Sequence, residues 1–379
     1  MPDLSSLPLR DSLRGLSPYG APQLDVPYML NTNENTHPVP AEVAEAITAR
    51  VAAVAGGLNR YPDREFTQLR EHLAGYLGHG IGPEQVWAAN GSNEVLQQIL
   101  QAFGGPGRTL LSFQPSYSMY PLLAAGTDTA FVDGGRAEDH TLSAEHAAEQ
   151  VRRHRPHVVV LASPNNPTGT ALELEVIEAV YDAQARNEAD GGHGAMIVVD
   201  EAYAEFALAG TRSALTLLPG RERLIVTRTM SKAFALAGAR LGYLAADAAV
   251  TDALRLVRLP YHLSAVTQAT ALAALEHVDT LLGTVEAIKG QRDRIVARLR
   301  ELGLHPAVSD SNFVFFGRFQ DAHAVWQALL AHGVLVRDVG IPHHLRVTAG
   351  TEEETTAFLT ALEVVLAEHP AERPAEPSA

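Results

Sequence analysis

The sequence predicts an α/β fold, with a large domain built on a mostly parallel central sheet flanked by helices and with a smaller α+β domain. Three short apolar runs rich in β-branched residues have the composition of strands covered on both faces: "HVVVLAS" (157–163), "AMIVVDE" (195–201) and "RLIVTRT" (223–229). A helical pattern at 173–189, ended by "DGGHG", lies between the first two runs. Strands that alternate with helices in this way favour a parallel sheet.

The other elements are predicted from similar patterns along the chain. Two earlier strands are expected at "QVWAAN" (85–90) and "RTLLSFQ" (108–114). After about residue 265, a long helical segment runs to about residue 304. It is followed by a strand in "SNFVFFGRF" (311–319), a short helix, strands in "GVLVRDV" (333–339) and "HLRVTAG" (344–350), and an amphipathic helix from Thr351.

This change of pattern divides the chain into two predicted domains. We expect the large domain to span 36–270 and the small domain to combine 1–35 with 271–366. Residues 367–379 are rich in Pro, Ala and Glu, a composition typical of a disordered tail.

Composition excludes several classes of protein and site. The chain has 379 residues, of which 46% are hydrophobic and 19% charged, as in a globular protein with room for two domains. Its 44 acidic residues outnumber its 29 basic ones, and the charge of −15 disfavours binding to nucleic acid or to an anionic membrane. Because cysteine is absent, disulfides and thiolate sites are excluded. No signal peptide pattern and no long apolar run is found, so we expect a soluble cytoplasmic protein.

Polar side chains follow the three apolar runs, and in an open parallel sheet ligands bind beyond the carboxyl ends of the strands. The first run is followed by two amides, the second by a carboxylate and a phenol, and the third by two hydroxyls and an amine. In this order the residues are Asn165, Asn166, Asp200, Tyr203, Thr229, Ser231 and Lys232. Considered singly, Asn166 could form an Asx turn, Asp200 could cap a helix, and Lys232 could be an exposed loop lysine. Together they indicate a site in which a lysine, desolvated and crowded by Arg240, serves as a neutral nucleophilic amine.

Motifs spread in order over nearly the whole chain carry a family resemblance. They are "LNTNENTHPVP" (30–40), "RYPD" (60–63), "GSNE" (91–94), "PSYSMYP" (115–121), "PNNPTG" (164–169), "DEAYAEF" (200–206), "TMSKAFALAGARLGY" (229–243), "PYHLS" (260–264) and "LRVTAG" (345–350). The ordered set resembles the class II, fold-type I pyridoxal-phosphate aminotransferases, and among them the histidinol-phosphate aminotransferase family.

The resemblance implies that pyridoxal 5'-phosphate is the cofactor and assigns roles around its ring. Lys232 would bind the cofactor covalently and then move the proton of the substrate carbon as base and acid. Asp200 would pair with the ring nitrogen, while Asn166 and Tyr203 would donate to the phenolic oxygen. Tyr117 would stack on the ring, although an aromatic residue in such a loop can also belong to the core.

The cofactor phosphate is a dianion, and its implied ligands are Gly91, Ser92, Asn93, Thr229, Ser231 and Arg240. The first three form a turn that opens a helix, where backbone N–H groups favour an anion. The hydroxyls and the arginine add further donors, and the alternative for Arg240 is an ion pair on a helix surface.

The resemblance also implies a second subunit and a substrate site. Tyr61 would reach the cofactor phosphate of the neighbouring subunit, so we expect a homodimer with composite active sites; packing beside Pro62 in its own chain is the alternative. Arg346 would bind the anionic group of each substrate. Arg337 would be a second cation there, unless it forms an ordinary surface ion pair.

The segment that would close over the substrate side chain contains Tyr19, Asn33 and Glu34. Three residues depart from the family pattern: Asn93 stands where an acid is usual, Thr36 where proline is, and His262 where asparagine is. These departures bear on the substrate contacts more than on the cofactor.

The expected reaction transfers the amino group of L-histidinol phosphate to 2-oxoglutarate, giving imidazole-acetol phosphate and L-glutamate in L-histidine biosynthesis. Two alternatives on the same fold remain open, an aromatic-amino-acid aminotransferase and a threonine-phosphate decarboxylase. A non-catalytic regulatory protein of this fold would be a different class. The 16 histidines are scattered and lack an H-E-x-x-H pattern, so we expect no catalytic metal.

Overall fold

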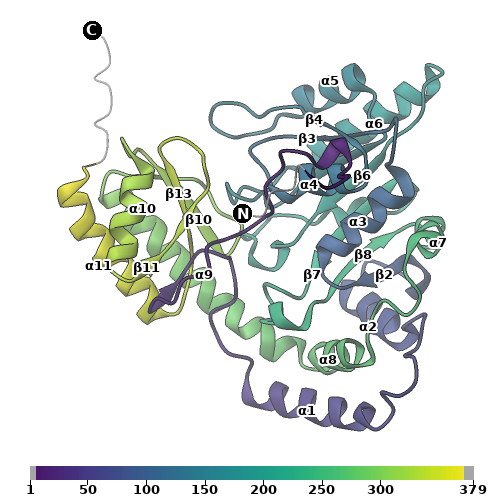
Figure 1. Cartoon of the computed structure of the whole chain (residues 1–379), viewed down its shortest axis with the longest axis horizontal. Coiled ribbons are helices and arrows are strands. Elements are labelled where there is room, and N and C mark those ends of the chain that lie inside the picture. Colours follow the sequence, from purple (N-terminus) through teal and green to yellow (C-terminus); the bar gives the residue numbers. More distant parts are fainter. Residues whose placement is uncertain (1–5, 371–379) are drawn as a thin grey trace.

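The computed structural model describes residues 6–370, and its largest sheet confirms the predicted α/β fold (Figure 1). Seven strands lie in the order β2-β8-β7-β6-β5-β3-β4. Their bounds are β2 Val86–Ala89, β3 Thr109–Ser112, β4 Ala130–Asp133, β5 Val158–Ala162, β6 Met196–Asp200, β7 Leu224–Thr229 and β8 Gly242–Ala246. Neighbouring strands are parallel, except that β8 is antiparallel to both β2 and β7.

Helices cover this sheet and bury it. They are α1 Ala41–Ala55, α2 Thr67–Leu77, α3 Ser92–Phe103, α4 Met119–Gly126, α5 Ala144–His154, α6 Leu174–Ala189, α7 Ala248–Val257 and α8 Ala265–Glu276. The helix α5 packs along α6, α3 packs on α7, and α1 packs along α8. Every residue of β5 is buried, which explains why its sequence is continuously apolar rather than alternating.

The strand β8 was not predicted from the sequence. Its residues are Gly, Tyr, Leu and Ala, without the β-branched residues that marked the other strands. A Cβ atom on Gly242 would lie 2.1 Å from the backbone nitrogen of Ser92, so glycine is needed for β8 to pass the start of α3. The strands β7 and β8 thereby pack on α3, and the loop between them carries Lys232.

The smaller part of the molecule is built on an antiparallel sheet of four strands in the order β12-β13-β10-β9. The strands are β9 His305–Pro306, β10 Phe313–Gly317, β12 Arg337–Asp338 and β13 His344–Thr348, and the helices around them are α9 Val278–Glu301, α10 Ala322–Ala331 and α11 Glu352–Glu368. Short 3₁₀ helices lie elsewhere in the chain, at Asp11–Leu13, Pro83–Gln85, Ala204–Phe206, Ala214–Leu217 and Ala237–Ala239.

Two predicted elements are each divided in the structure. The strand expected at 333–339 is β11 (Val334–Leu335) followed by β12, because β11 pairs with the N-terminal β1 (Tyr28–Met29) while β12 pairs with β13. The helix expected at 265–304 is α8 and α9, separated at His277, whose backbone is not helical. The predicted start of α11 is confirmed, since Thr351 caps it and forms a capping box with Glu354.

The domain boundaries remain a prediction. The helix α8 packs on α1 and α2 of the large part, whereas α9 packs on β9, β10 and α11 of the small part, so the chain passes between them near His277 (Figure 1). The helix α11 ends at Glu368, two residues inside the predicted tail, and residues 371–379 lie outside the described residues.

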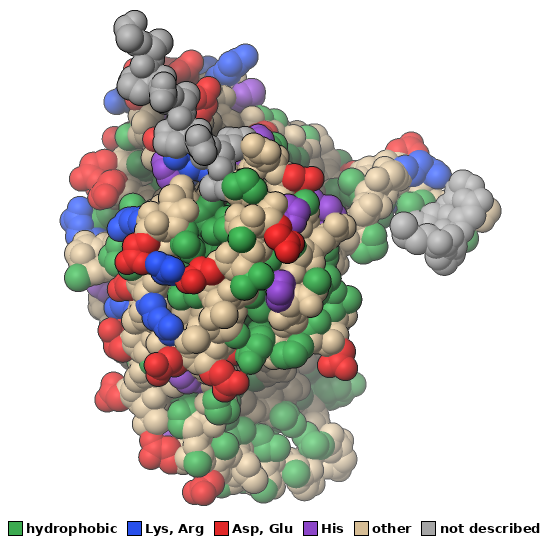
Figure 2. All heavy atoms as spheres, turned by 90° about the vertical axis from the view of Figure 1, so that its left-hand side faces the viewer, with side chains coloured by type: hydrophobic (Ala, Val, Ile, Leu, Met, Phe, Trp, Pro, Cys, Tyr) green, Lys and Arg blue, Asp and Glu red, His purple; other side chains and the backbone are tan. Residues whose placement is uncertain are grey.

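Among residues 6–370, no helix has both the length and the apolar character required to cross a membrane. Figure 2 shows the face that carries α10 and α11, where Lys and Arg side chains are interspersed with Asp and Glu side chains. The described basic residues on that face therefore do not form one continuous basic surface.

Candidate active site

The carboxyl ends of β5, β6 and β7 open into one cavity of about 370 Å³, which is within the usual size of small-molecule sites. Most residues predicted for the site line it: Tyr19, Asn33, Ser92, Asn93, Tyr117, Asn166, Asp200, Tyr203, Thr229, Ser231, Lys232, Arg240 and Arg346. The N-terminal segment, the large sheet and the small sheet all contribute to this set. The structure thus brings together side chains that are more than 300 positions apart in the sequence.

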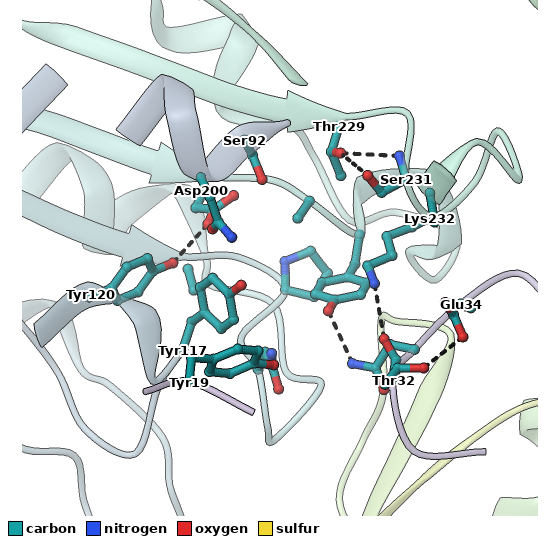
Figure 3. Close-up of a pocket in the computed structure, with 18 of the residues that line it drawn as sticks. Tyr19, Thr32, Glu34, Ser92, Tyr117, Tyr120, Asp200, Thr229, Ser231 and Lys232 are labelled. Atoms are coloured by element: carbon teal, nitrogen blue, oxygen red, sulfur yellow. Dashed lines mark hydrogen bonds between the residues drawn. The ribbon is translucent and has the colours of Figure 1, made fainter. Parts of the chain in front are cut away.

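Lys232 lies in the loop after β7, with its amine directed across the cavity (Figure 3). Its Nζ donates to the backbone carbonyl oxygen of Thr32 at 3.1 Å. Burial and, after it, the Arg346 cation lower the pKa of Lys232 to about 8, against an opposing contribution from Glu34. Arg240, the cation expected from the sequence, acts in the same direction but less than Arg346.

Asp200, the last residue of β6, is a buried carboxylate on the same cavity. Its oxygens accept hydrogen bonds from Tyr120 Oη at 2.9 Å and from Thr227 Oγ1 at 3.1 Å. Burial raises its pKa, and these two donors oppose that effect. Among the ion pairs of residues 6–370, none includes Asp200, so the carboxylate has no cation to neutralise it.

One end of the cavity is suited to an anion. Ser92 is the first residue of α3, so the unpaired N–H groups of the helix start are close by. Thr229 Oγ1 and Ser231 Oγ are 3.0 Å apart across the turn that leads to Lys232 (Figure 3). Arg240 completes this end and forms no ion pair among the described residues.

Gly91, which caps α3, does not line the cavity but shapes this end. Its φ of 85° lies in the left-handed region, and a Cβ atom there would come within 2.7 Å of Arg240 Nη2. Glycine therefore lets the guanidinium of Arg240 lie against the turn.

The opposite end of the cavity contains Arg346, a buried residue of β13. Its Nη1 donates to Asn166 Oδ1 at 2.5 Å and its Nη2 to the carbonyl oxygen of Asn31 at 2.7 Å, while its Nε is buried without a hydrogen-bond partner. Burial lowers the pKa of Arg346 to about 10. A buried guanidinium held only by neutral oxygens has capacity for an anionic ligand.

Aromatic side chains form the remaining walls. Tyr203 Oη accepts a hydrogen bond from Asn33 Nδ2 at 3.0 Å, and burial raises the pKa of Tyr203 to about 12, so its hydroxyl stays protonated. The rings of Tyr19 and Tyr117 meet edge to face with centroids 6.3 Å apart. The N-terminal segment is thus packed on the cavity through Tyr19.

Besides Gly91, two predicted site residues do not line the cavity of this chain. Tyr61 is 79% exposed and stacks on Tyr261 with ring centroids 4.3 Å apart. Arg337 pairs in register with Arg346 across β12 and β13, but its guanidinium donates weakly to the carbonyl oxygen of Gly20 at 3.4 Å. The ring contact of Tyr61 is with Tyr261 of the same chain, and both the role in a neighbouring subunit and the alternative of packing beside Pro62 stay predictions.

Sequence reasoning missed three contributors to the site: Tyr120 and Thr227, which bind Asp200, and Thr32, which binds Lys232. A signal existed for two of them. Tyr120 is three residues after Tyr117, so both can face one way at the start of a helix, and Thr227 alternates with Thr229 along β7. The contact of Thr32 is made by its backbone and has no sequence signal.

The structure shows where Glu34 and His262 lie relative to the cavity. Glu34 lines the cavity and accepts a hydrogen bond from Thr32 Oγ1 at 2.7 Å. His262 lies outside it, where its Nε2 is 2.9 Å from the carbonyl oxygen of Ala88 and its ring stacks on Trp87. Among residues 6–370, no three His, Asp or Glu side chains gather in a way that could hold a metal ion.

The family model described as Aminotransferase class I and II matches residues 28–362. The chain is 70% identical, over 96% of both chains, to a protein named histidinol-phosphate aminotransferase from Paenarthrobacter aurescens (strain TC1). It is 63% identical, over 95% of this chain and 90% of the relative, to a protein of the same name from Frankia casuarinae.

Solved structures of aminotransferases are also similar to this chain. The chain is similar to histidinol-phosphate aminotransferase from Sinorhizobium meliloti in complex with pyridoxal-5'-phosphate, with a TM-score of 0.80, 26% identity, and coverage of 90% of this chain and 92% of that one. It is also similar to aspartate aminotransferase from Thermus thermophilus with maleate, with a TM-score of 0.76, 25% identity and the same coverages of 90% and 92%. Because the matched region includes every strand of the large sheet and the relatives match over nearly their full length, the chain belongs to the aminotransferase class I and II family.

Proposed function

We propose that the chain is a pyridoxal-phosphate-dependent transaminase that moves the amino group of L-histidinol phosphate to 2-oxoglutarate, in the biosynthesis of L-histidine. The observation that carries this proposal is one cavity that holds an amine, Lys232, and a carboxylate, Asp200, between two separate cationic ends. Relatives that are 63% and 70% identical and are named for this activity support the choice of substrate.

The described residues fit pyridoxal phosphate. Asp200 is buried without a cation, which suits a carboxylate that would pair with the ring nitrogen of the cofactor. The start of α3 and Arg240 would hold the phosphate, and glycine at position 91 keeps that turn open. When bound, this cofactor withdraws electrons from the substrate carbon that loses its proton.

The chain itself would bind the reactants and move the proton. With its pKa lowered to about 8, Lys232 Nζ is unprotonated in part of the molecules near neutral pH, so it can take the proton from the substrate carbon and return it. Arg346 would bind the phosphate of histidinol phosphate in one half-reaction and a carboxylate of 2-oxoglutarate in the other, with Arg337 nearby as a second cation. Asn166 and Tyr203 would orient the cofactor ring through its phenolic oxygen.

Two copies of the chain would form the working enzyme, and each would give Tyr61 to the cofactor phosphate of the other. Large apolar side chains that a second copy could cover are exposed in the segments that carry Tyr61 and its ring partner Tyr261, namely Leu58, Leu256, Leu259 and Tyr261 itself. A cytoplasmic location is part of the proposal, because a chain without cysteine needs no oxidising compartment.

The test is a side-by-side assay of L-histidinol phosphate, phenylalanine and tyrosine as amino donors, each with 2-oxoglutarate and added pyridoxal phosphate. We expect the highest kcat/KM with histidinol phosphate. A higher value with phenylalanine would support the aromatic-amino-acid alternative, because the Tyr19 and Tyr117 pair could also contact an aromatic side chain. Release of carbon dioxide from threonine phosphate would support the decarboxylase, and binding of cofactor without turnover of any donor would support a regulatory protein.

A further inference from the structure

The carboxylate of Asp200 is held by hydrogen-bond donors from two different parts of the fold. Thr227 lies on β7 directly across from Asp200 in the sheet register, so the backbone ladder between β6 and β7 fixes its position. Tyr120 lies on α4, outside the sheet, and its hydroxyl donates to Oδ2. In Figure 3, Tyr120 reaches Asp200 from the side away from Lys232. The orientation of Oδ2 therefore depends on a side chain that the sheet does not hold.

Tyr120 lines the same cavity as Asp200 and binds that carboxylate through its hydroxyl. Its side chain is 1% exposed, and its ring packs edge to face on Tyr117 with centroids 5.5 Å apart and planes at 90°. Asp200 is the one side chain bonded to its hydroxyl among the hydrogen bonds of the described residues. Burial and the nearby carboxylate raise the pKa of Tyr120 well above its usual value, so the hydroxyl stays protonated and can donate.

We propose that Tyr120 is a positioning residue, whose hydroxyl keeps Asp200 ionised and turns its carboxylate toward the cavity to receive the cationic ring nitrogen of the cofactor. The carboxylate also receives hydrogen bonds from Thr227 and from the backbone of Ala202, and loss of the Tyr120 donor removes one of the groups that oppose the effect of burial, which favours the neutral acid. A neutral acid pairs poorly with a ring cation. The inference rests on the proposed function in that it takes pyridoxal phosphate as the ligand.

The test measures cofactor affinity rather than turnover. The apoprotein and its Tyr120→Phe variant are titrated with pyridoxal phosphate and, in parallel, with the 1-deaza analogue, in which carbon replaces the ring nitrogen. We expect Tyr120→Phe to weaken binding of pyridoxal phosphate by roughly 10-fold and to leave binding of the analogue unchanged. An equal loss for both ligands would mean that Tyr120 only supports the structure, and unchanged affinity for pyridoxal phosphate would also overturn the proposal.

Two further variants test whether Tyr120 orients Asp200 or only packs in the core. Tyr243→Phe removes the hydroxyl of another fully buried tyrosine, on β8, which is not bonded to Asp200, and it should leave the affinity for pyridoxal phosphate unchanged. Adding Tyr120→Phe to Asp200→Asn should cause no further loss, because no carboxylate remains to be oriented. A further loss as large as in the wild-type background would contradict the positioning role.

Titration of the wild-type apoprotein distinguishes failure of this proposal from failure of the proposed function. If the wild-type apoprotein binds no pyridoxal phosphate, the proposed function fails. If it binds the cofactor and Tyr120→Phe binds it equally well, only the role of Tyr120 fails. Thermal unfolding of each apoprotein checks that the variants are folded before the titration.

Discussion

The two ends of the active-site cavity are built in different ways. The anion-binding end uses residues close together in the sequence, such as Thr229, Ser231 and Arg240, and a helix start that glycine allows them to approach. At the other end, Arg346 bonds to Asn166, 180 positions away, and to Asn31, 315 positions away. One end, called the local end, thus takes most of its side chains from a single loop that packs on the start of α3. The other, called the long-range end, forms only when the N-terminal segment and the two sheets come together.

The cations at the two ends also differ in their surroundings. Arg240 is exposed, and its Nη1 donates to the carbonyl oxygen of Ala237 at 2.9 Å. Arg346 is buried and its pKa is lowered to about 10, which means that its environment disfavours the charge. An anion that reaches Arg346 relieves an unfavourable burial, so we expect the end with Arg346 to contribute more binding free energy per contact.

The largest expected effect is at Lys232, which lies between the two ends. The chain has only two lysines, Lys232 and Lys289, and Lys289 lies on α9. Lys232→Ala should lower kcat by roughly 1,000-fold or more, because the group that moves the proton is removed. Lys289→Ala is the matched control and should retain full activity. Steady-state assays with thermal melting check both, and near-normal turnover by Lys232→Ala would refute its assigned role.

Replacing Arg346, the cation of the long-range end, should weaken the binding of the substrates. Arg346→Gln should lower kcat/KM by about 100-fold for histidinol phosphate and for glutamate alike, since both anions would lose the same buried guanidinium. The affinity for pyridoxal phosphate, measured by titration of the apoprotein, should change far less, because Arg346 reaches the cofactor site only through Asn166 and the pKa of Lys232. A large loss of cofactor affinity would show that the two ends are not separate sites.

Removal of the cation at the local end should act on the cofactor. Arg240→Gln should weaken pyridoxal phosphate by about 10-fold, because one charge-assisted contact to a dianion is lost while the start of α3 and the hydroxyls remain. At saturating cofactor, the KM for histidinol phosphate should not change. If KM rises instead, Arg240 contacts the substrate and the division proposed here is wrong.

The contrast between short-range and long-range contacts also explains how much of the fold and of the active site could be predicted from the sequence. The strands β5, β6 and β7 were found because their residues are β-branched and buried on both faces, and the polar residues at their ends followed from the rule for open parallel sheets. The cavity then gathered Asn166, Asp200 and Lys232 as expected.

The features that were not predicted depend on contacts across the fold. The reversed strand β8 has no β-branched residue, and its direction follows from its pairing with both β2 and β7. The bond from Tyr120 to Asp200 joins residues 80 positions apart, and the bond from Lys232 to the backbone of Thr32 depends on where the N-terminal segment lies. That Arg346 lowers the pKa of Lys232 more than Arg240 does could be seen only once the fold had placed β13 of the small sheet on the same cavity as Lys232.

The smallest expected effect is on the pKa of Lys232, and it compares the two ends directly. Both arginines lower this pKa, which is about 8, and Arg346 does so more strongly. Arg346→Gln should therefore raise the pKa of Lys232 toward its ordinary value of 10.5, and Arg240→Gln should raise it less. In either variant a smaller fraction of Lys232 is unprotonated at pH 7.5.

The rate of acylation of Lys232 in the apoprotein, followed against pH by peptide mass spectrometry, measures this shift, and Lys289 serves as the internal reference on each molecule. A folded-state pKa below that of the unfolded chain also means that stability falls as the pH drops from about 10.5 to about 8, so the variants should lose less stability over this range than the wild type. If Arg240→Gln shifts the acylation profile more than Arg346→Gln does, the pKa of Lys232 depends mainly on the local end. The long-range end then serves only to bind substrate.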